Sequence, residues 1–152
     1  MRKLRNLTGI AVICNRKKIG RVIQAQLSDD LSALEGIWVD CALRGTRYIA
    51  AEHIGTIGEV AIIADHRGKR RRMNARSMIY RAVGTDGRRI GAITGAEIDE
   101  VSLMVNALEL SRGFWDDIYN GRSIIRKYSV NAEAGETVIV DSNEQNKEDD
   151  EL

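Results

Sequence analysis

The sequence predicts an all-β protein built from two tandem copies of one small barrel, and three observations support this prediction. Residues of similar character recur 71 positions apart along the chain. Within the recurring segments, apolar and polar residues alternate with a period of two, which is typical of strands that have one buried face. Turn-forming dipeptides such as Asp86-Gly87 separate the segments, and many short strands between turns are typical of barrels.

The repeat is clearest where two basic residues precede an Ile-Gly pair. Residues 17–22 read Lys-Lys-Ile-Gly-Arg-Val, and residues 88–93 read Arg-Arg-Ile-Gly-Ala-Ile. At the same spacing, Ala11-Val12 corresponds to Ala82-Val83. A slip of one residue would turn every side chain of a strand to the opposite face, so a shared alternation indicates a shared fold. The inward-facing residues are predicted to be Ile19, Ile23, Ala25 and Leu27 in the first copy and Ile90, Ala92, Ala96 and Ile98 in the second.

Both copies are predicted to contain the same series of strands. In the first copy these lie at 9–13, from residue 19 onward, at 37–41, at 47–50 and at 60–64. Their counterparts lie at 78–83, from residue 90 onward, at 105–110, at 123–128 and at 137–141. The closing strands are 77 positions apart because the second copy contains six additional residues around 113–121. This insertion is expected to form a helical turn or a packed loop.

The distribution of charge sets the predicted domain boundaries. The two barrels are predicted at 5–66 and 75–141, joined by a basic linker at 67–74. The segment 142–152 holds five acidic residues and one base, and is predicted to be a disordered acidic tail. The whole chain has 23 basic and 22 acidic residues, a net charge of +1, so without the tail 22 bases and 17 acids would leave +5.

The basic pair, the Ile-Gly pair and the strand that follows resemble the PRC-barrel superfamily in both copies. The segment 54–63, which reads Ile-Gly-Thr-Ile-Gly-Glu-Val-Ala-Ile-Ile, resembles the closing element of that superfamily. The resemblance covers nearly all of residues 5–141, and the second copy departs from it at 113–121. The superfamily occurs in photosynthetic reaction-centre H subunits, in the ribosome maturation factor RimM and as free-standing proteins. It implies a small β-barrel that acts as an adaptor rather than as an enzyme.

The composition indicates a soluble protein. The longest apolar runs, such as 60–64, have the length of a strand and are too short for a signal peptide or a membrane span,. The chain has two cysteines, Cys14 and Cys41, far fewer than a secreted disulfide scaffold of this size contains. We therefore expect a cytoplasmic protein without a membrane span, whose cysteines are reduced and buried.

No recognisable catalytic, cofactor or metal motif is present. The glycines between 84 and 91 fit neither the dinucleotide nor the P-loop spacing, and glycines inside strands more often mark bulges or tight corners,. Cys14, Cys41, His53 and His66 lack the paired spacing of zinc ligands,. Nucleophilic catalysis needs a nucleophile beside an activating base, and no such signature accompanies the histidines. We expect no catalytic residue, no metal and no cofactor.

Two groups of side chains are candidates for binding surfaces. The candidate contact for nucleic acid or for an acidic partner comprises Arg67, Lys69, Arg70, Arg71, Arg72 and Arg76. Such a strip would supply salt-sensitive, sequence-independent affinity for phosphates, although a solvated linker or a partner for the acidic tail are alternatives. The candidate protein interface comprises Trp38, Phe114, Trp115 and Tyr119. Trp38 has the opposite phase to Ile37 and Val39, so we expect it to face away from the barrel interior, either toward a partner or between the copies.

Two functional hypotheses follow from these surfaces. The first is a non-enzymatic adaptor that binds an unidentified protein through a barrel face or through the insertion at 113–121. The second is an RNA- or ribosome-associated assembly factor that uses the basic segment 67–76. The sequence identifies neither the partner nor the oligomeric state.

Overall fold

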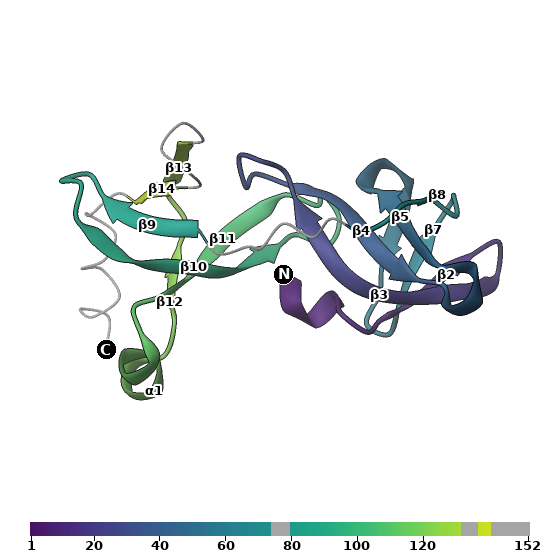
Figure 1. Cartoon of the computed structure of the whole chain (residues 1–152), viewed down its shortest axis with the longest axis horizontal. Helices are drawn as coiled ribbons and strands as arrows, with labels where there is room; N and C mark the ends of the chain where they lie inside the picture. Colours follow the sequence, from purple (N-terminus) through teal and green to yellow (C-terminus); the bar gives the residue numbers. More distant parts are fainter. Residues whose placement is uncertain (74–79, 132–136, 141–152) are drawn as a thin grey trace. The chain divides into compact units, whose positions relative to one another are not determined.

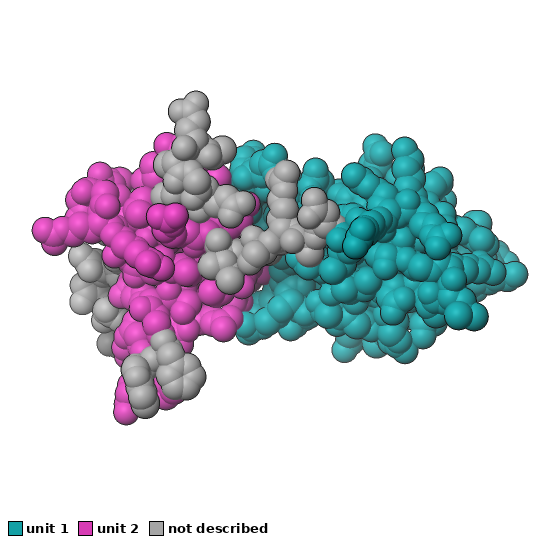
Figure 2. Space-filling view, in the orientation of Figure 1, with its two compact units in different colours: residues 1–76, 98–105 teal, residues 77–97, 106–152 magenta. Residues whose placement is uncertain are grey.

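The computed structural model describes residues 1–73, 80–131 and 137–140. In this part of the chain strands predominate, and one α-helix is present, α1 (Phe114–Asn120). The chain divides into two compact units (Figure 2). The first unit comprises residues 1–76 and 98–105, and the second comprises 77–97 and 106–152. The prediction of an all-β protein with two barrel-like units is confirmed.

The first unit is a curled sheet with strand order β6-β7-β2-β3-β4-β5-β8 (Figure 1). Its elements are β1 (Arg2–Lys3), η1 (Leu4–Leu7), β2 (Ala11–Cys14), β3 (Lys17–Leu27), β4 (Leu34–Asp40), η2 (Ala42–Arg44), β5 (Thr46–Ala50), η3 (Ala51–His53), β6 (Ile54–Ile57), β7 (Ala61–Ala64) and β8 (Lys69–Arg70), where η denotes a 3-10 helix. Neighbouring strands are antiparallel except β2 and β7, which are parallel.

The second unit repeats this topology with strand order β12-β11-β10-β9-β14-β13. Its strands are β9 (Tyr80–Gly84), β10 (Arg89–Ile98), β11 (Val105–Ser111), β12 (Ser123–Ile125), β13 (Tyr128–Asn131) and β14 (Thr137–Val140). Here β14 pairs with β9 in parallel, as β7 pairs with β2 in the first unit. The order read from β13 to β12 therefore matches the order from β6 to β5 strand for strand.

The long strands of both copies bury side chains at equivalent positions, each 71 residues from its counterpart. Those of the first copy are Val22, Ala25, Leu27, Ile37 and Val39, and those of the second are Ile93, Ala96, Ile98, Leu108 and Leu110. All ten are at most 6% exposed. Burial of such side chains is the main stabilising contribution to a barrel of this size.

The predicted alternation is wrong at Ile23 on β3 and at Ala92 on β10, because Val22 and Ile93 are the buried residues there. Val22 pairs with Val39, and Gln24 pairs with Trp38, so Ile23 is the additional residue of a β-bulge. A bulge shifts the strand by one residue and reverses which side chains point inward. As a result Val22 is 3% exposed and packs in the core, while Ile23 is only partly buried.

The spacing of 71 holds for the long strands but not for the first and last strands. Val12 and Ala82, which are 70 residues apart, occupy equivalent places, because each pairs with the glycine of its Ile-Gly motif. In the first copy β2 and β3 are joined by a two-residue turn at Asn15 and Arg16, both with positive φ. The second copy has a three-residue turn, closed by a hydrogen bond from the Gly84 amide to the Arg88 carbonyl oxygen. The closing strands, aligned by their pairing with β2 and β9, are 76 residues apart.

The segment predicted to be a linker continues the first sheet as β8. Tyr48 pairs with Lys69, and Arg47 pairs with Arg70. The amide of Arg71 then donates to the Thr46 carbonyl oxygen at 3.2 Å. The linker was predicted at 67–74; its last residue, Arg76 and the predicted tail at 142–152 lie outside the described residues.

Residues 98–105, the turn between β10 and β11, belong to the first unit. The Leu34 amide donates to the Leu103 carbonyl oxygen, and the Val105 amide donates to the Ser32 carbonyl oxygen, both at 2.8 Å. These two hydrogen bonds are related by the repeat, because adding 71 to Leu34 and Ser32 gives Val105 and Leu103.

Candidate binding surfaces

Most of the basic residues that the sequence singled out gather at one edge of the first sheet. We define the basic edge as the cations on and beside β5 and β8: Arg44, Arg47, Arg67, Lys69, Arg70, Arg71 and Arg72. All of them except Arg47 are exposed. Arg44 and Arg47 were not singled out from the sequence, because they lie 23 and 20 residues before Arg67, where the basic segment begins. Only the pairing of β5 with β8 brings them together.

Arg47 holds the chain before β8 in place. Its Nε donates to the Arg67 carbonyl oxygen at 2.9 Å, and its Nη2 donates to the Gly68 carbonyl oxygen at 2.8 Å. The Gly68 amide in turn donates to Nδ1 of His66 at 2.9 Å. Gly68 has φ of 75°, and a Cβ there would lie 2.3 Å from the Tyr48 carbonyl oxygen. The close approach of this segment to β5 therefore requires glycine.

An aromatic pair lies beside the basic edge on the outer face of the sheet. The ring centroids of Trp38 and Tyr48 are 4.8 Å apart, and Nε1 of Trp38 donates to Oε1 of Gln26 at 3.0 Å. The guanidinium of Arg71 lies 5.4 Å from the Tyr48 centroid and 6.0 Å from the Trp38 centroid. Burial, and to a smaller extent the nearby Glu35 carboxylate, raises the pKa of Tyr48. These contacts leave Trp38 only 4% exposed, covered within the first unit rather than available to a partner.

The basic edge carries an excess of positive charge. No ion pair joins any of its seven cations to a carboxylate in the described part of the chain. Of the acidic residues on β4, Glu35 accepts a hydrogen bond from Gln26 at 2.6 Å, and Asp40 accepts one from the Ala42 amide at 2.9 Å. The field of the clustered cations is therefore directed toward solvent and attracts anions.

The insertion of the second copy forms α1, which exposes apolar residues. Ile118 is 57% exposed and Tyr119 is 78% exposed. The side chains of Phe114 and Trp115, the other aromatic residues of the predicted protein interface, lie outside the described part of the structure. Of the two predicted forms of 113–121, a helical turn or a packed loop, the structure shows the helical one, as a two-turn helix.

Polar contacts attach α1 to the sheet. Oδ2 of Asp117 accepts a hydrogen bond from the Ser111 hydroxyl at 2.7 Å. Arg122 lies 3.9 Å from the same carboxylate and 3.4 Å from Oε2 of Glu109, which is 3% exposed. These polar side chains attach α1 to the sheet. The apolar side chains of Ile118 and Tyr119 take no part in this attachment.

Each copy has an equivalent surface depression between its Ile-Gly motif and the end of its second long strand. The first, about 310 Å³, is lined by residues 18–21 and 40–42, and the second, about 360 Å³, by residues 89–92 and 111–113. A Cβ at Gly20 would lie 2.2 Å from the Asp40 carbonyl oxygen, and one at Gly91 would lie 2.2 Å from the Ser111 carbonyl oxygen. The Ile-Gly motif thus permits close backbone contact.

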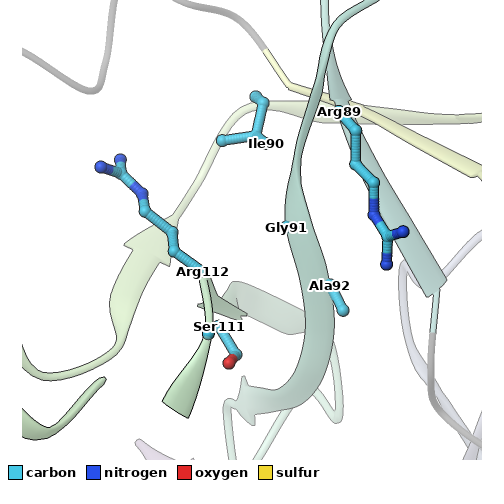
Figure 3. A pocket seen from close by; sticks show the side chains of 7 residues that line it. Arg89, Ile90, Gly91, Ala92, Ser111 and Arg112 are labelled. Atoms are coloured by element: carbon cyan, nitrogen blue, oxygen red, sulfur yellow. The ribbon is translucent and has the colours of Figure 1, made fainter. Parts of the chain in front are cut away.

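The second depression does not gather its cations around one point. Figure 3 shows Arg89 and Arg112 on opposite sides of β10, with their guanidinium groups directed away from each other. An anion at this depression would therefore meet one of the two guanidinium groups rather than both.

The histidines make contacts within the first unit, and the cysteines are buried. Nδ1 of His53 lies 2.9 Å from Oδ1 of Asp65, and the rings of His53 and His66 stack with centroids 4.9 Å apart. Cys14 and Cys41 are buried and free, as predicted. Among residues 1–73, 80–131 and 137–140, no group of three potential ligands could hold a metal ion. No helix in this part of the chain is long and apolar enough to cross a membrane.

No protein-family model matches the chain, and no curated protein matches it. The resemblance to the PRC-barrel superfamily therefore stays a prediction. The function must be inferred from the surfaces described above.

Proposed function

We propose that this protein is a non-enzymatic adaptor that binds another protein through α1 of the second unit. The observation that carries the proposal is the exposure of Ile118 and Tyr119, at 57% and 78%, on a helix anchored by other residues. Tyrosine is enriched at protein interfaces, where its ring supplies apolar contact area and its hydroxyl a hydrogen bond.

The position of α1 in the repeat supports this proposal. In the first copy the same connection is the short 3-10 helix η2 (Ala42–Arg44), which exposes Leu43 completely. Both copies therefore display an apolar side chain beside equivalent depressions, and the second copy enlarges this feature into a helix. Connections on a rigid scaffold commonly carry binding residues, because their sequence can change without loss of the core.

Retention of partner proteins from cell lysate by the full-length chain tests the proposal. The variants are Ile118→Asp and Tyr119→Asp, and the matched control is Val60→Asp, because Val60 is 79% exposed on the first unit. Loss of a buried interface anchor costs about 2 kcal/mol or more, which weakens binding by about 30-fold. We expect the same protein to be retained by wild type and Val60→Asp and lost from both α1 variants. A partner retained equally by all four proteins would refute the role of α1.

A further inference from the structure

The basic edge carries an inference that is independent of α1. We propose that this edge binds single-stranded nucleic acid through its phosphates, without sequence preference, and that Arg71 supplies a surface on which a base stacks. The proposal rests on three features: the density of cations, the fixed backbone that carries them, and the position of Arg71 over two aromatic rings.

The density of cations indicates a polyanionic ligand. Lys69, Arg70 and Arg72 are exposed within four consecutive residues. Arg44 lies close by at the start of β5, because a Cβ at its neighbour Gly45 would lie 3.2 Å from Nε of Arg70. A single carboxylate or phosphate would neutralise only one or two of these charges. A nucleic-acid backbone presents a phosphate at every nucleotide, so it can engage several cations at once and release their counterions.

The β5–β8 pairing holds the backbone that carries Lys69 and Arg70 in a fixed arrangement before any ligand binds. Lys69 and Arg70 are in register with Tyr48 and Arg47, and the Arg47 guanidinium is hydrogen-bonded to the two carbonyl groups that precede β8. Residues paired directly across two strands share a face, so Lys69 lies on the same face of the sheet as Tyr48, and Arg70 lies on the opposite face with Arg47. An extended nucleic acid bound along β8 would not have to order this backbone, which reduces the entropic cost of binding.

Arg71 adds a feature that a simple cluster of charges lacks. Its guanidinium covers Tyr48 and Trp38 at centroid distances of 5.4 and 6.0 Å, and the residue is exposed. Unpaired bases stack on guanidinium planes as well as on aromatic rings. Arg71 held over the two rings therefore offers a flat cationic surface on the face of the sheet that carries Lys69. This arrangement is typical of sites that bind single strands.

Binding is measured by fluorescence anisotropy with the full-length chain and a fluorescein-labelled 12-nucleotide oligouridine, over a series of salt concentrations. The first variant is Lys69→Glu/Arg70→Glu/Arg72→Glu. The matched control is Arg81→Glu/Arg88→Glu/Arg89→Glu, which makes the same change of charge at three exposed arginines of the second unit. Circular dichroism of each variant verifies that the fold is retained.

The logarithm of the binding constant should fall with the logarithm of salt concentration by about 0.7 per phosphate contacted. We expect wild type and the control to bind with similar slopes. The basic-edge variant should bind more weakly, with a slope shallower by about 2, because three contacts are lost. Absence of binding by wild type at low salt, or equal weakening by both triple variants, would overturn the proposal.

Arg71→Lys separates stacking from charge, since lysine keeps the positive charge and loses the planar group. We expect the salt slope to remain unchanged while the affinity falls by about 5- to 150-fold, the range for one stacked base. An unchanged affinity would remove Arg71 from the site.

A poly-glutamate peptide of 12 residues serves as the competing ligand. Displacement of the RNA by this peptide at equal concentration would show that the surface is selective for acidic protein segments instead.

Discussion

Trp38 and Glu109 occupy equivalent positions 71 residues apart on the second long strand of each copy, and both are buried, at 4% and 3% exposure. Trp38 packs under Tyr48 and Arg71, whereas Glu109 contacts Arg122. One position of a duplicated scaffold thus supports an aromatic and cationic surface in the first copy. In the second copy it supports the polar contacts that hold α1.

The contact between Arg122 and Glu109 should contribute to the stability of the second unit. Replacement of the guanidinium by an apolar side chain in Arg122→Met removes a cation that lies 3.4 Å from a buried carboxylate, which costs about 1–3 kcal/mol. Urea unfolding measures this loss. Arg112→Met is the control, because Arg112 is exposed and makes no ion pair in the described part of the chain, and it should change stability by no more than about 0.5 kcal/mol. Equal stability of the two variants would contradict the anchoring role of Arg122.

The glycines of the Ile-Gly motif should not tolerate a side chain. In Gly20→Ala and Gly91→Ala, the added methyl group would lie 2.2 Å from a backbone carbonyl oxygen of the neighbouring strand. The strands must separate to accept it, at a cost of about 1–3 kcal/mol in each unit. Gly55→Ala is the matched control within a strand, because its nearest atom would be 3.5 Å away. Thermal unfolding should show a lowered Tm for the first two variants only.

The reactivity of Cys41 should depend on folding. Burial raises the pKa of its thiol, and the positive charge of Arg47 offsets part of this rise. Since the thiolate is the reactive form, iodoacetamide should modify Cys41 slowly at pH 8 in the folded protein and rapidly in urea. A raised pKa in the folded state means that the unfolded chain loses this proton first as pH rises. The contribution of Cys41 to stability is therefore complete below the pKa of the unfolded thiol and declines above it. Equal rates of modification in buffer and in urea would contradict the burial of this thiol.

Removal of the acidic segment 142–152 should strengthen binding of nucleic acid. The deletion changes the net charge from +1 to +5, because five acids and one base are lost. Reduced repulsion between the chain and the phosphates should raise affinity at 50 mM salt, and the gain should diminish at 300 mM salt as charges are screened. Anisotropy titrations of the full-length and shortened chains measure both effects. A gain that persists at high salt would indicate a cause other than electrostatics.

Strand phase allowed the duplication and most of the core to be predicted from the sequence. It failed where the backbone departs from regular pairing: the bulge at Ile23, and the turn at Asn15 and Arg16 that is one residue shorter than its counterpart. Neither leaves a distinct signal in composition, because both depend on how two strands align. For the same reason Val12 was matched with Val83, whereas its structural equivalent is Ala82.

The candidate surfaces were only partly predictable. The basic segment was visible as a run of charge, but its role as strand β8 was not, since two residues are too few for a recognisable alternation. Tyr48 was not identified as a candidate from the sequence, because only its pairing with Lys69 places it beside the cations. Trp38 was correctly placed on the face opposite to Ile37, yet the sequence could not show that Tyr48 and Arg71 cover it there.

Photo-crosslinking tests the adaptor proposal most directly. A benzophenone amino acid is introduced at Tyr119, or at Val60 as a control of equal exposure, and the full-length chain is irradiated in cell lysate. The account predicts a discrete crosslinked protein from position 119, lost when Ile118 is changed to aspartate, and none from position 60. The same crosslinked protein from both positions, or none from either, would contradict a binding surface on α1.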